Sequence, residues 1–231
     1  MISKPEVLEV GLAIGQGTGP ELADVFTKLP KQLACLFNVQ VRVHRSSRIY
    51  HSYHSLFSTG RNLRHIREET AQDAAHCEDL CKKQAAQCLK VIFGTAFMAQ
   101  SQYLVRQHLE SVKVELFHKQ SVDILLIRDQ AQGFYTGSNP YGVDALAVSR
   151  ACQSDTAIFG RIVSYALSCA RKSWGEDTQI DSLTMVYKYH LFDGVFDVWA
   201  QKWSRRHGLH IQFIHPDAMN RNILAFGIQS R

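Results

Sequence analysis

Residues 7–14 are almost entirely apolar and lead directly into Gly15, and this junction constrains the fold more than any other feature of the chain. A continuous apolar run of this length predicts a strand that is buried on both faces. Gly17 and Gly19 allow a tight turn after it, and Pro20 suits the first turn of a helix. The chain is therefore predicted to open with a strand, a turn and a helix.

The same patterns predict further elements along the chain. Strands are expected at residues 38–44, 89–93, 112–117, 122–127, 143–148, 180–187 and 210–214, and helices at 68–88, 100–109, 156–171 and 191–203. The polar stretch 45–64 is interpreted as a long loop. Alternating strands and helices predict an α/β fold, with a layered, partly parallel sheet and flanking helices. We place a soft boundary between a domain of residues 1–100 and one of residues 101–231.

Composition and charge argue against several classes of protein. The hydrophobic fraction of 45% and charged fraction of 20% are ordinary for a globular protein. No apolar run approaches the roughly 20 residues that cross a bilayer, so a cytoplasmic protein without a membrane segment is expected. The net charge of +5 is modest, and the cluster of Lys202, Arg205, Arg206 and His207 is interpreted as a solvated helix end rather than a nucleic-acid site.

Three residues are candidates for carboxylate binding and acid/base chemistry. Arg128 ends an apolar strand, where its guanidinium suits a carboxylate ligand or, alternatively, a structural ion pair. Tyr135 lies between two glycines, and a phenol with an ordinary pKa near 10 acts as a proton donor. Lys188 ends another predicted strand in apolar surroundings, and burial would lower its pKa so that it can accept a proton. Alternatively, Tyr135 and Lys188 are ordinary polar residues at strand ends.

Three segments carry a resemblance to a known family: IGQGTGPE at 14–21, IRDQAQGFYTG at 127–137 and MVYK at 185–188. They resemble the isocitrate and isopropylmalate dehydrogenases, which are metal-dependent, NAD(P)-linked β-decarboxylating enzymes. The resemblance implies that Arg128 binds a substrate carboxylate, and it matches Arg106 less securely to a second substrate arginine. It further implies that Tyr135 and Lys188 handle protonation at the enol and hydroxyl oxygens, with the lysine reaching the site from the other subunit.

The chain departs from that family at the cofactor and metal sites. It corresponds to about the first two thirds of a family member, without the adenosine-binding loop and the later metal-binding aspartates. Gln16 stands where the family usually has aspartate, and the glycine turn lacks dinucleotide-binding spacing. Asp217 matches the first metal aspartate, but one carboxylate is a poor site for a hard cation. We therefore expect neither cofactor nor metal, and interpret Asp217 as a helix cap or ion-pair partner.

These features favour a cofactor-independent isomerase, lyase or cyclase that carries out proton transfer on an acidic or enolisable small molecule in biosynthesis. One alternative is a catalytically inactive relative with a binding or regulatory role. Another is a fragment of an NAD-dependent decarboxylating dehydrogenase that a partner chain completes. The resemblance also predicts a symmetric homodimer, in which Lys188 completes the site of the other subunit.

Overall fold

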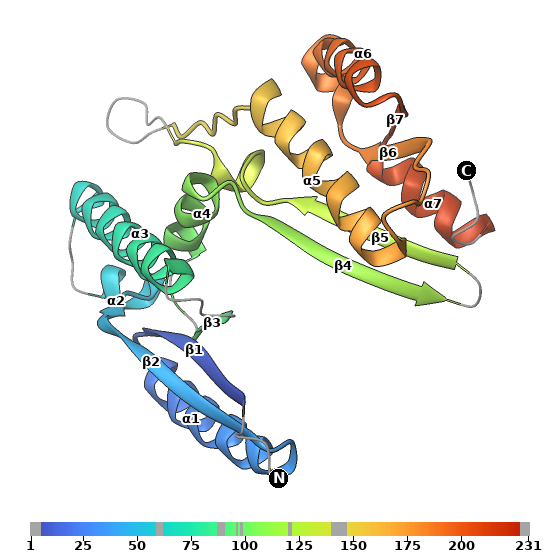
Figure 1. Cartoon of the computed structure of the whole chain (residues 1–231). Helices are drawn as coiled ribbons and strands as arrows, with labels where there is room; N and C mark the ends of the chain where they lie inside the picture. The colour runs from blue at the N-terminus through green and yellow to red at the C-terminus, as the bar shows by residue number, and fades with distance from the viewer. Residues whose placement is uncertain are drawn as a thin grey trace. The chain divides into compact units, whose positions relative to one another are not determined.

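The computed structural model describes residues 6–58, 62–86, 91–95, 97, 99–119, 122–139 and 147–226. The contacts within the chain divide it into two compact units, Met1–Ser111 and Val112–Arg231 (Figure 1). This division falls later than the sequence-based boundary because α4 (Ala99–His108) packs on α3 (Leu63–Ala86) and so joins the first unit.

The first unit contains a three-stranded parallel sheet. Its central strand is β1 (Glu6–Gly15), with β2 (Val39–Tyr50) on one side and β3 (Val91–Gly94) on the other. The helix α1 (Gly19–Leu36) connects β1 to β2. The second half of β1 is buried throughout, as its apolar sequence predicted. The predicted βαβ arrangement is therefore confirmed.

The glycines between β1 and α1 serve a tight structural turn. The amide of Gly15 donates to Thr95 Oγ1 at 2.7 Å, which ties the end of β1 to the residue after β3. Gly17 adopts a φ of 78°, a conformation that favours glycine. A Cβ atom on Gly19 would lie 2.9 Å from Thr95 Oγ1, so this position is closed to larger residues. Pro20 lies in the first turn of α1, as expected.

The stretch 45–64 is not the long loop that the sequence predicted. β2 continues to Tyr50, whose side chain is fully buried, and a short helix, α2 (Tyr53–Phe57), follows with Ser52 as its N-cap. The prediction was wrong because polar residues interrupt the apolar alternation, and in the structure these residues have partners. Arg48, for example, donates from Nε to Asp73 Oδ1 on α3 at 2.7 Å.

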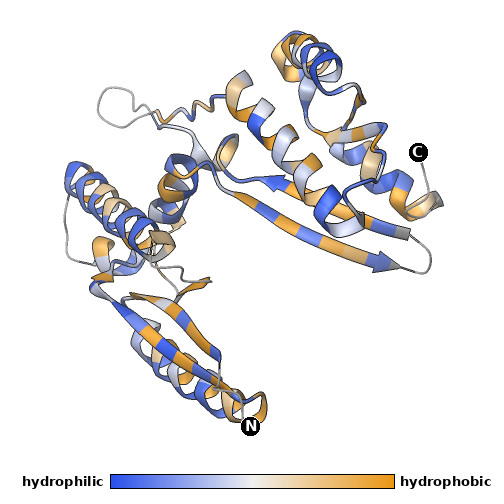
Figure 2. Ribbon diagram, in the orientation of Figure 1, coloured by the Kyte–Doolittle hydropathy of each residue, from blue (hydrophilic) through white to orange (hydrophobic). Residues whose placement is uncertain are grey.

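The described residues of the second unit form two two-stranded sheets and three α-helices. These are the antiparallel pair β4 (Val112–Lys119) and β5 (Val122–Asp129), the parallel pair β6 (Ser182–Val186) and β7 (His210–Ile214), and the helices α5 (Thr156–Trp174), α6 (Val195–His207) and α7 (Pro216–Phe226). Polar and apolar residues alternate along β4 (Figure 2). The core is formed by α5, α6 and β7, through Phe159, Val163, Leu167, Phe196, Ala200, Trp203, Leu209 and Ile211.

Two predicted elements of this unit differ from the structure. The helix expected at 191–203 begins at Val195, because Asp193 and Gly194 have φ values of 48° and 80° and separate it from a 3₁₀ helix, η3 (Tyr189–Phe192). Residues 143–146 of the strand expected at 143–148 lie outside the described residues, and the remaining two belong to no β-strand element. Within the described residues, none of the helices has both the length and the apolar character that a bilayer crossing requires.

Candidate functional site

Asp129, the last residue of β5, organises the segment that carries Tyr135. Its Oδ1 accepts hydrogen bonds from the amides of Ala131 at 2.8 Å and Gln132 at 3.2 Å, and its Oδ2 accepts from the Gln132 side chain at 2.8 Å. An aspartate that accepts backbone amides two and three residues ahead closes a tight turn. This turn leads into a short 3₁₀ helix, η1 (Phe134–Thr136), which contains the backbone of Tyr135.

The same carboxylate joins the end of β5 to the end of β6. The hydroxyl of Tyr187 donates to Asp129 Oδ2 at 3.3 Å across 58 residues of sequence. Burial, followed by the charge of Asp129, raises the pKa of Tyr187, so the phenol keeps its proton and remains a donor. Arg128 and Lys188 are the chain neighbours of this hydrogen-bonded pair. The structure therefore brings two segments that carry predicted site residues to one place.

The helix α5 is attached to the same hydrogen-bond network. The side-chain oxygen of Gln132 accepts the backbone amide of Asp155 at 2.6 Å. Asp155 in turn caps α5, because its Oδ1 accepts the amides of Ala157 at 2.6 Å and Ile158 at 3.3 Å. The turn after β5 and the start of α5 are thus held together by side chains.

Arg128 forms the ion pair that the sequence left open as an alternative. Its side chain lies on the opposite face of the β4–β5 ribbon from Asp129, because successive strand residues point to opposite faces. Its Nη2 lies 3.3 Å from Glu115 Oε2, and Lys113, which is opposite Arg128 in the register, contacts the same carboxylate at 2.8 Å. Lys113 foremost, together with Arg128, lowers the pKa of Glu115. Arg128 remains 58% exposed, so its role with a ligand stays a prediction.

The environments of the other predicted site residues differ. Lys188 lies two residues after β6 and is exposed, so the chain alone does not supply the burial that the sequence predicted for it. The side chain of Tyr135 lies outside the described residues. Arg106 belongs to the first unit, in the last turn of α4, where its guanidinium lies 5.4 Å from the centre of the Tyr103 ring. Their proposed contacts with substrate stay predictions.

Asp217 lies in the first turn of α7, directly after Pro216. A carboxylate there interacts favourably with the positive end of the helix dipole. Asp217 is therefore the second residue of the helix and does not occupy the N-cap position, so its interpretation as a helix cap is wrong, and its role as an ion-pair partner stays a prediction.

Among the described residues, one group of three has the spacing of metal ligands: His51, Glu69 and Asp73, in the first unit. However, Arg48 donates to Asp73 at 2.7 Å and lies 3.2 Å from Glu69. The Asp73 carboxylate also accepts the backbone amide of His51 at 2.7 Å. A guanidinium that already compensates both carboxylates fits a structural ion-pair network and not a cation site.

Sequence reasoning missed Asp129 and Tyr187, although each is adjacent to a predicted site residue. Asp129 had a usable signal, because aspartate directly after an apolar strand often accepts amides of the following turn. Tyr187 had none, because its partner is 58 residues away.

No protein-family model and no curated protein matches this sequence. Among solved structures, the crystal structure of isocitrate dehydrogenase from Methylococcus capsulatus has a TM-score of 0.60 at 16% identity, over 95% of this chain and 64% of that chain. A β-decarboxylating dehydrogenase from Thermococcus kodakarensis, in its apo form, has a TM-score of 0.47 at 14% identity, over 95% and 61%. The chain therefore has the α/β fold of part of isocitrate dehydrogenase and spans 64% of the length of that enzyme.

Proposed function

We propose that this chain is a cofactor-independent enzyme of the isomerase, lyase or cyclase type, which transfers protons on an acidic or enolisable small molecule. Arg128 binds a carboxylate of the substrate, and Arg106 is a second candidate for that role. Lys188 removes a proton from the carbon next to a carbonyl, or stabilises the enolate as a cation. Tyr135 donates a proton to the enolate oxygen.

The hydrogen bond between Tyr187 and Asp129 is the observation that supports this proposal most directly. It joins the chain neighbours of Lys188 and Arg128, and Asp129 also closes the turn before Tyr135. Acid/base catalysis requires groups that are held in a defined mutual geometry. A half-buried carboxylate that anchors the backbone of these segments supplies such a framework.

The test begins with a panel of dicarboxylates and keto acids. Thermal unfolding of the chain is measured with each compound, and turnover of the stabilising compounds is then followed by NMR in deuterated water. We expect solvent deuterium to enter the product, because proton abstraction and return exchange hydrogen with solvent. Tyr135→Phe and Lys188→Ala are expected to lower turnover at least 100-fold. Unchanged turnover in both variants refutes the proposal.

Matched controls separate chemistry from general damage. Tyr165→Phe and Lys172→Ala change exposed residues of α5 and should leave turnover within twofold. Lys188→Arg keeps the positive charge but is not a base at neutral pH. Retained turnover in Lys188→Arg would show that Lys188 acts through its positive charge. Loss of turnover in this variant would show that Lys188 acts as a general base.

We further propose a homodimer in which Lys188 of each chain lies in the site of the other. The exposure of Lys188 in the single chain is compatible with this arrangement. Light scattering should give twice the chain mass. Mixing inactive Tyr135→Phe with inactive Lys188→Ala should restore up to about a quarter of the activity, because random exchange leaves half of the chains in mixed dimers. A monomer with full turnover contradicts the shared site.

One observation favours the second candidate, a binding or regulatory protein. The helix α1 has an apolar face that is separate from the face that packs on the sheet. Its members are spaced three or four residues apart and are between 44% and 77% exposed: Leu22, Val25, Leu29, Leu33 and Leu36. A helix that is apolar on two sides is normally covered on both. Replacing Val25 and Leu29 with glutamate should abolish co-purification of a partner protein and leave turnover unchanged.

A further inference from the structure

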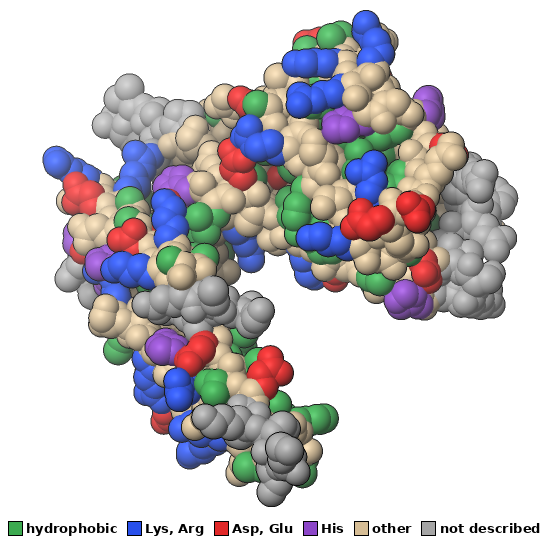
Figure 3. All heavy atoms as spheres, viewed as in Figure 1, with side chains coloured by type: hydrophobic (Ala, Val, Ile, Leu, Met, Phe, Trp, Pro, Cys, Tyr) green, Lys and Arg blue, Asp and Glu red, His purple; other side chains and the backbone are tan. Residues whose placement is uncertain are grey.

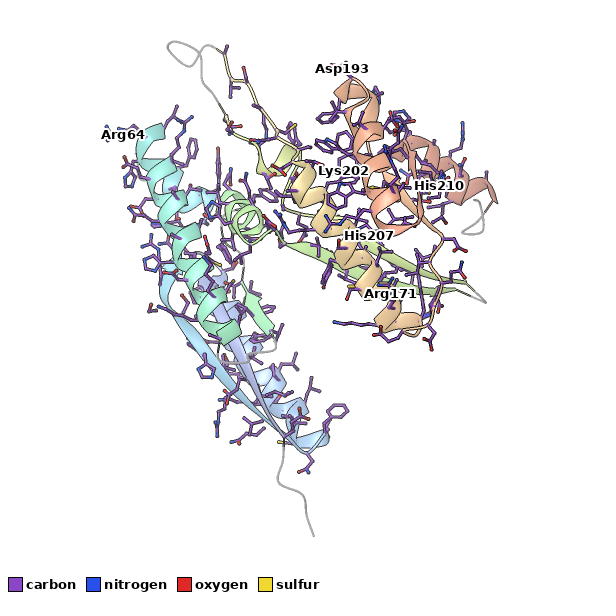
Figure 4. The ribbon with its side chains drawn as sticks, turned by 45° about the horizontal axis from the view of Figure 1, so that its top comes forward. Arg64, Arg171, Asp193, Lys202, His207 and His210 are labelled. Carbon is purple, nitrogen blue, oxygen red and sulfur yellow. The ribbon has the colours of Figure 1, made fainter. Side chains whose placement is uncertain are left out.

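A groove between α5 and α6 of the second unit has features of a binding site that the proposed catalytic residues do not use. It has a volume of about 320 Å³ and is lined by Ala157, Gly160, Arg161 and Ser164 of α5 and by Trp203 and Arg206 of α6. Figure 4 labels Arg171 on α5 and Lys202 and His207 on α6, the two helices that border it.

The two helices contact each other in a regular register. The ring of Trp203 lies over Gly160, and Ser164 Oγ lies 3.4 Å from His207 Nε2. In both pairs, the α6 residue stands 43 positions after its α5 partner in the sequence. The ring atoms nearest to Gly160 are Cζ2, Cη2 and Cε2. Because Cε2 is bonded to Nε1, the indole nitrogen lies close to Gly160, one of the residues that line the groove.

This indole N–H is buried without an acceptor. Trp203 is 6% exposed, and its Nε1 has no hydrogen-bond partner among the described residues. The indole nitrogen can only donate, and a buried donor without a partner costs about 1–3 kcal/mol. An oxygen atom of a ligand in the groove is the kind of group that would relieve this cost.

The electrostatic field around the groove is positive. α5 and α6 together carry six Arg and Lys residues and one carboxylate, Asp197. The net positive charge of these two helices therefore equals the formal net charge of the whole chain, +5. Figure 3 shows Lys and Arg side chains gathered where α6 lies in Figure 1. Within the described residues, no carboxylate forms an ion pair with Lys202 or Arg206. The field therefore favours an anion.

The positions of these cations favour a compact anion over a nucleic-acid base. Lys202 Nζ and Arg206 Cζ lie 5.4 Å and 4.9 Å from the centre of the Trp203 ring, so the indole offers no open face for base stacking. Burial, followed by Arg206 and Arg171, lowers the pKa of His207, so the imidazole beside the groove is mainly neutral at pH 7. Charge for the anion thus comes from the arginines.

We propose that the α5–α6 groove binds an oxyanion, the phosphate or carboxylate group of a small molecule, through the guanidinium groups of Arg206 and Arg161 and the indole N–H of Trp203. Charge-assisted bonds from guanidinium groups are the strong component of such sites. The indole N–H adds direction, because it donates to an oxygen atom in one fixed position. This site is independent of Arg128, Tyr135 and Lys188.

The indole N–H provides a direct measurement. In ¹H–¹⁵N NMR spectra of the full chain, inorganic phosphate and acetate are titrated separately at constant ionic strength. The Trp203 indole signal is assigned by elimination with Trp174→Phe and Trp199→Phe. We expect a saturable shift of this signal with at least one of the two anions. A shift with phosphate alone identifies a phosphate group as the ligand chemistry, and a shift with acetate alone identifies a carboxylate.

Charge-matched variants test the location of the site. Arg206→Gln should weaken binding about 10- to 100-fold. Arg161→Gln, an exposed residue on the other helix, should weaken it similarly. Arg205→Gln removes the same charge from α6, but its side chain lines a different surface beside β7, so binding should stay within twofold.

Two outcomes overturn the proposal. The first is a Trp203 indole signal that does not move with either anion. The second is a loss of affinity in Arg205→Gln equal to that in Arg206→Gln, which would indicate diffuse surface charge. If the chain binds duplex DNA tightly, and Arg205→Gln and Arg206→Gln weaken that binding equally, the groove belongs to a surface that binds polyanions and is not a local oxyanion site.

Discussion

Gly160→Ala is expected to destabilise the second unit, although alanine is the better helix former. In an exposed helix interior this change stabilises by about 1 kcal/mol. At Gly160 the added Cβ would lie 1.9 Å from Cζ2 and 2.2 Å from Cη2 of Trp203. Carbon atoms in favourable contact are about 3.5–4.0 Å apart. One of the two groups must therefore move by more than an ångström.

The surroundings of Trp203 oppose that movement. The ring is 6% exposed and belongs to the core that α5, α6 and β7 share. Adding a methyl group to a packed core typically costs about 1–3 kcal/mol of stability. We expect a cost near the upper limit, because the added Cβ would overlap strongly with the Trp203 ring. Subtracting the propensity gain of about 1 kcal/mol leaves a net loss of about 2 kcal/mol, which corresponds to a melting temperature about 10 °C lower.

Urea unfolding followed by tryptophan fluorescence measures this loss. Ser173→Ala, an exposed change in the same helix, is the control and should alter stability by less than about 0.5 kcal/mol. In a Trp203→Phe background, the smaller ring should remove most of the cost of Gly160→Ala. A gain in stability from Gly160→Ala in the natural background would refute the reasoning, because it would show that the indole does not occupy this space.

Three further changes test other parts of the structure. Asp129→Ala removes the acceptor of four partly buried hydrogen bonds and should lower the free energy of unfolding, measured with urea, by about 3 kcal/mol. A loss under about 0.5 kcal/mol would contradict the central position of Asp129. A hydrogen bond from Cys77 lowers the pKa of Cys81. The midpoint of a pH profile of Cys81 alkylation, followed by mass spectrometry, should therefore move to higher pH in Cys77→Ala, and an unchanged profile would disprove the coupling. Burial raises the pKa of Tyr50 to about 12. Its stabilising effect is therefore full below pH 10 and declines as the pH rises toward 12, and Tyr50→Phe should show a smaller decline in urea midpoint over that range than the natural chain.

Several parts of the fold could be predicted from local sequence patterns. The apolar run before Gly15 predicted a buried central strand, and α1 and β2 follow it as a βαβ unit. β7 has the predicted bounds, and β4 and β5 extend two residues beyond theirs. In each case the pattern of apolar residues within a short segment is enough, because strand and helix periodicity are local properties.

Prediction failed where distant partners decide local structure. The polar sequence around Arg48 predicted a loop, but the ion pair between Arg48 and Asp73, which is 25 residues away, stabilises the last part of β2. The start of α6 was misplaced because positive φ angles at Asp193 and Gly194 interrupt a continuous apolar pattern. Neither effect has a signal within a short window of sequence.

The sequence by itself determined the α/β class, the order of most elements, and the candidates Arg128, Tyr135 and Lys188. The tertiary structure alone decided that Tyr187 donates a hydrogen bond to Asp129, and that Trp203 lies over Gly160 beside a groove lined by arginines. The physical reason is that local patterns specify which face of each element is apolar. Which particular atoms meet across the core is decided by packing the elements together, and that packing creates the site and the groove.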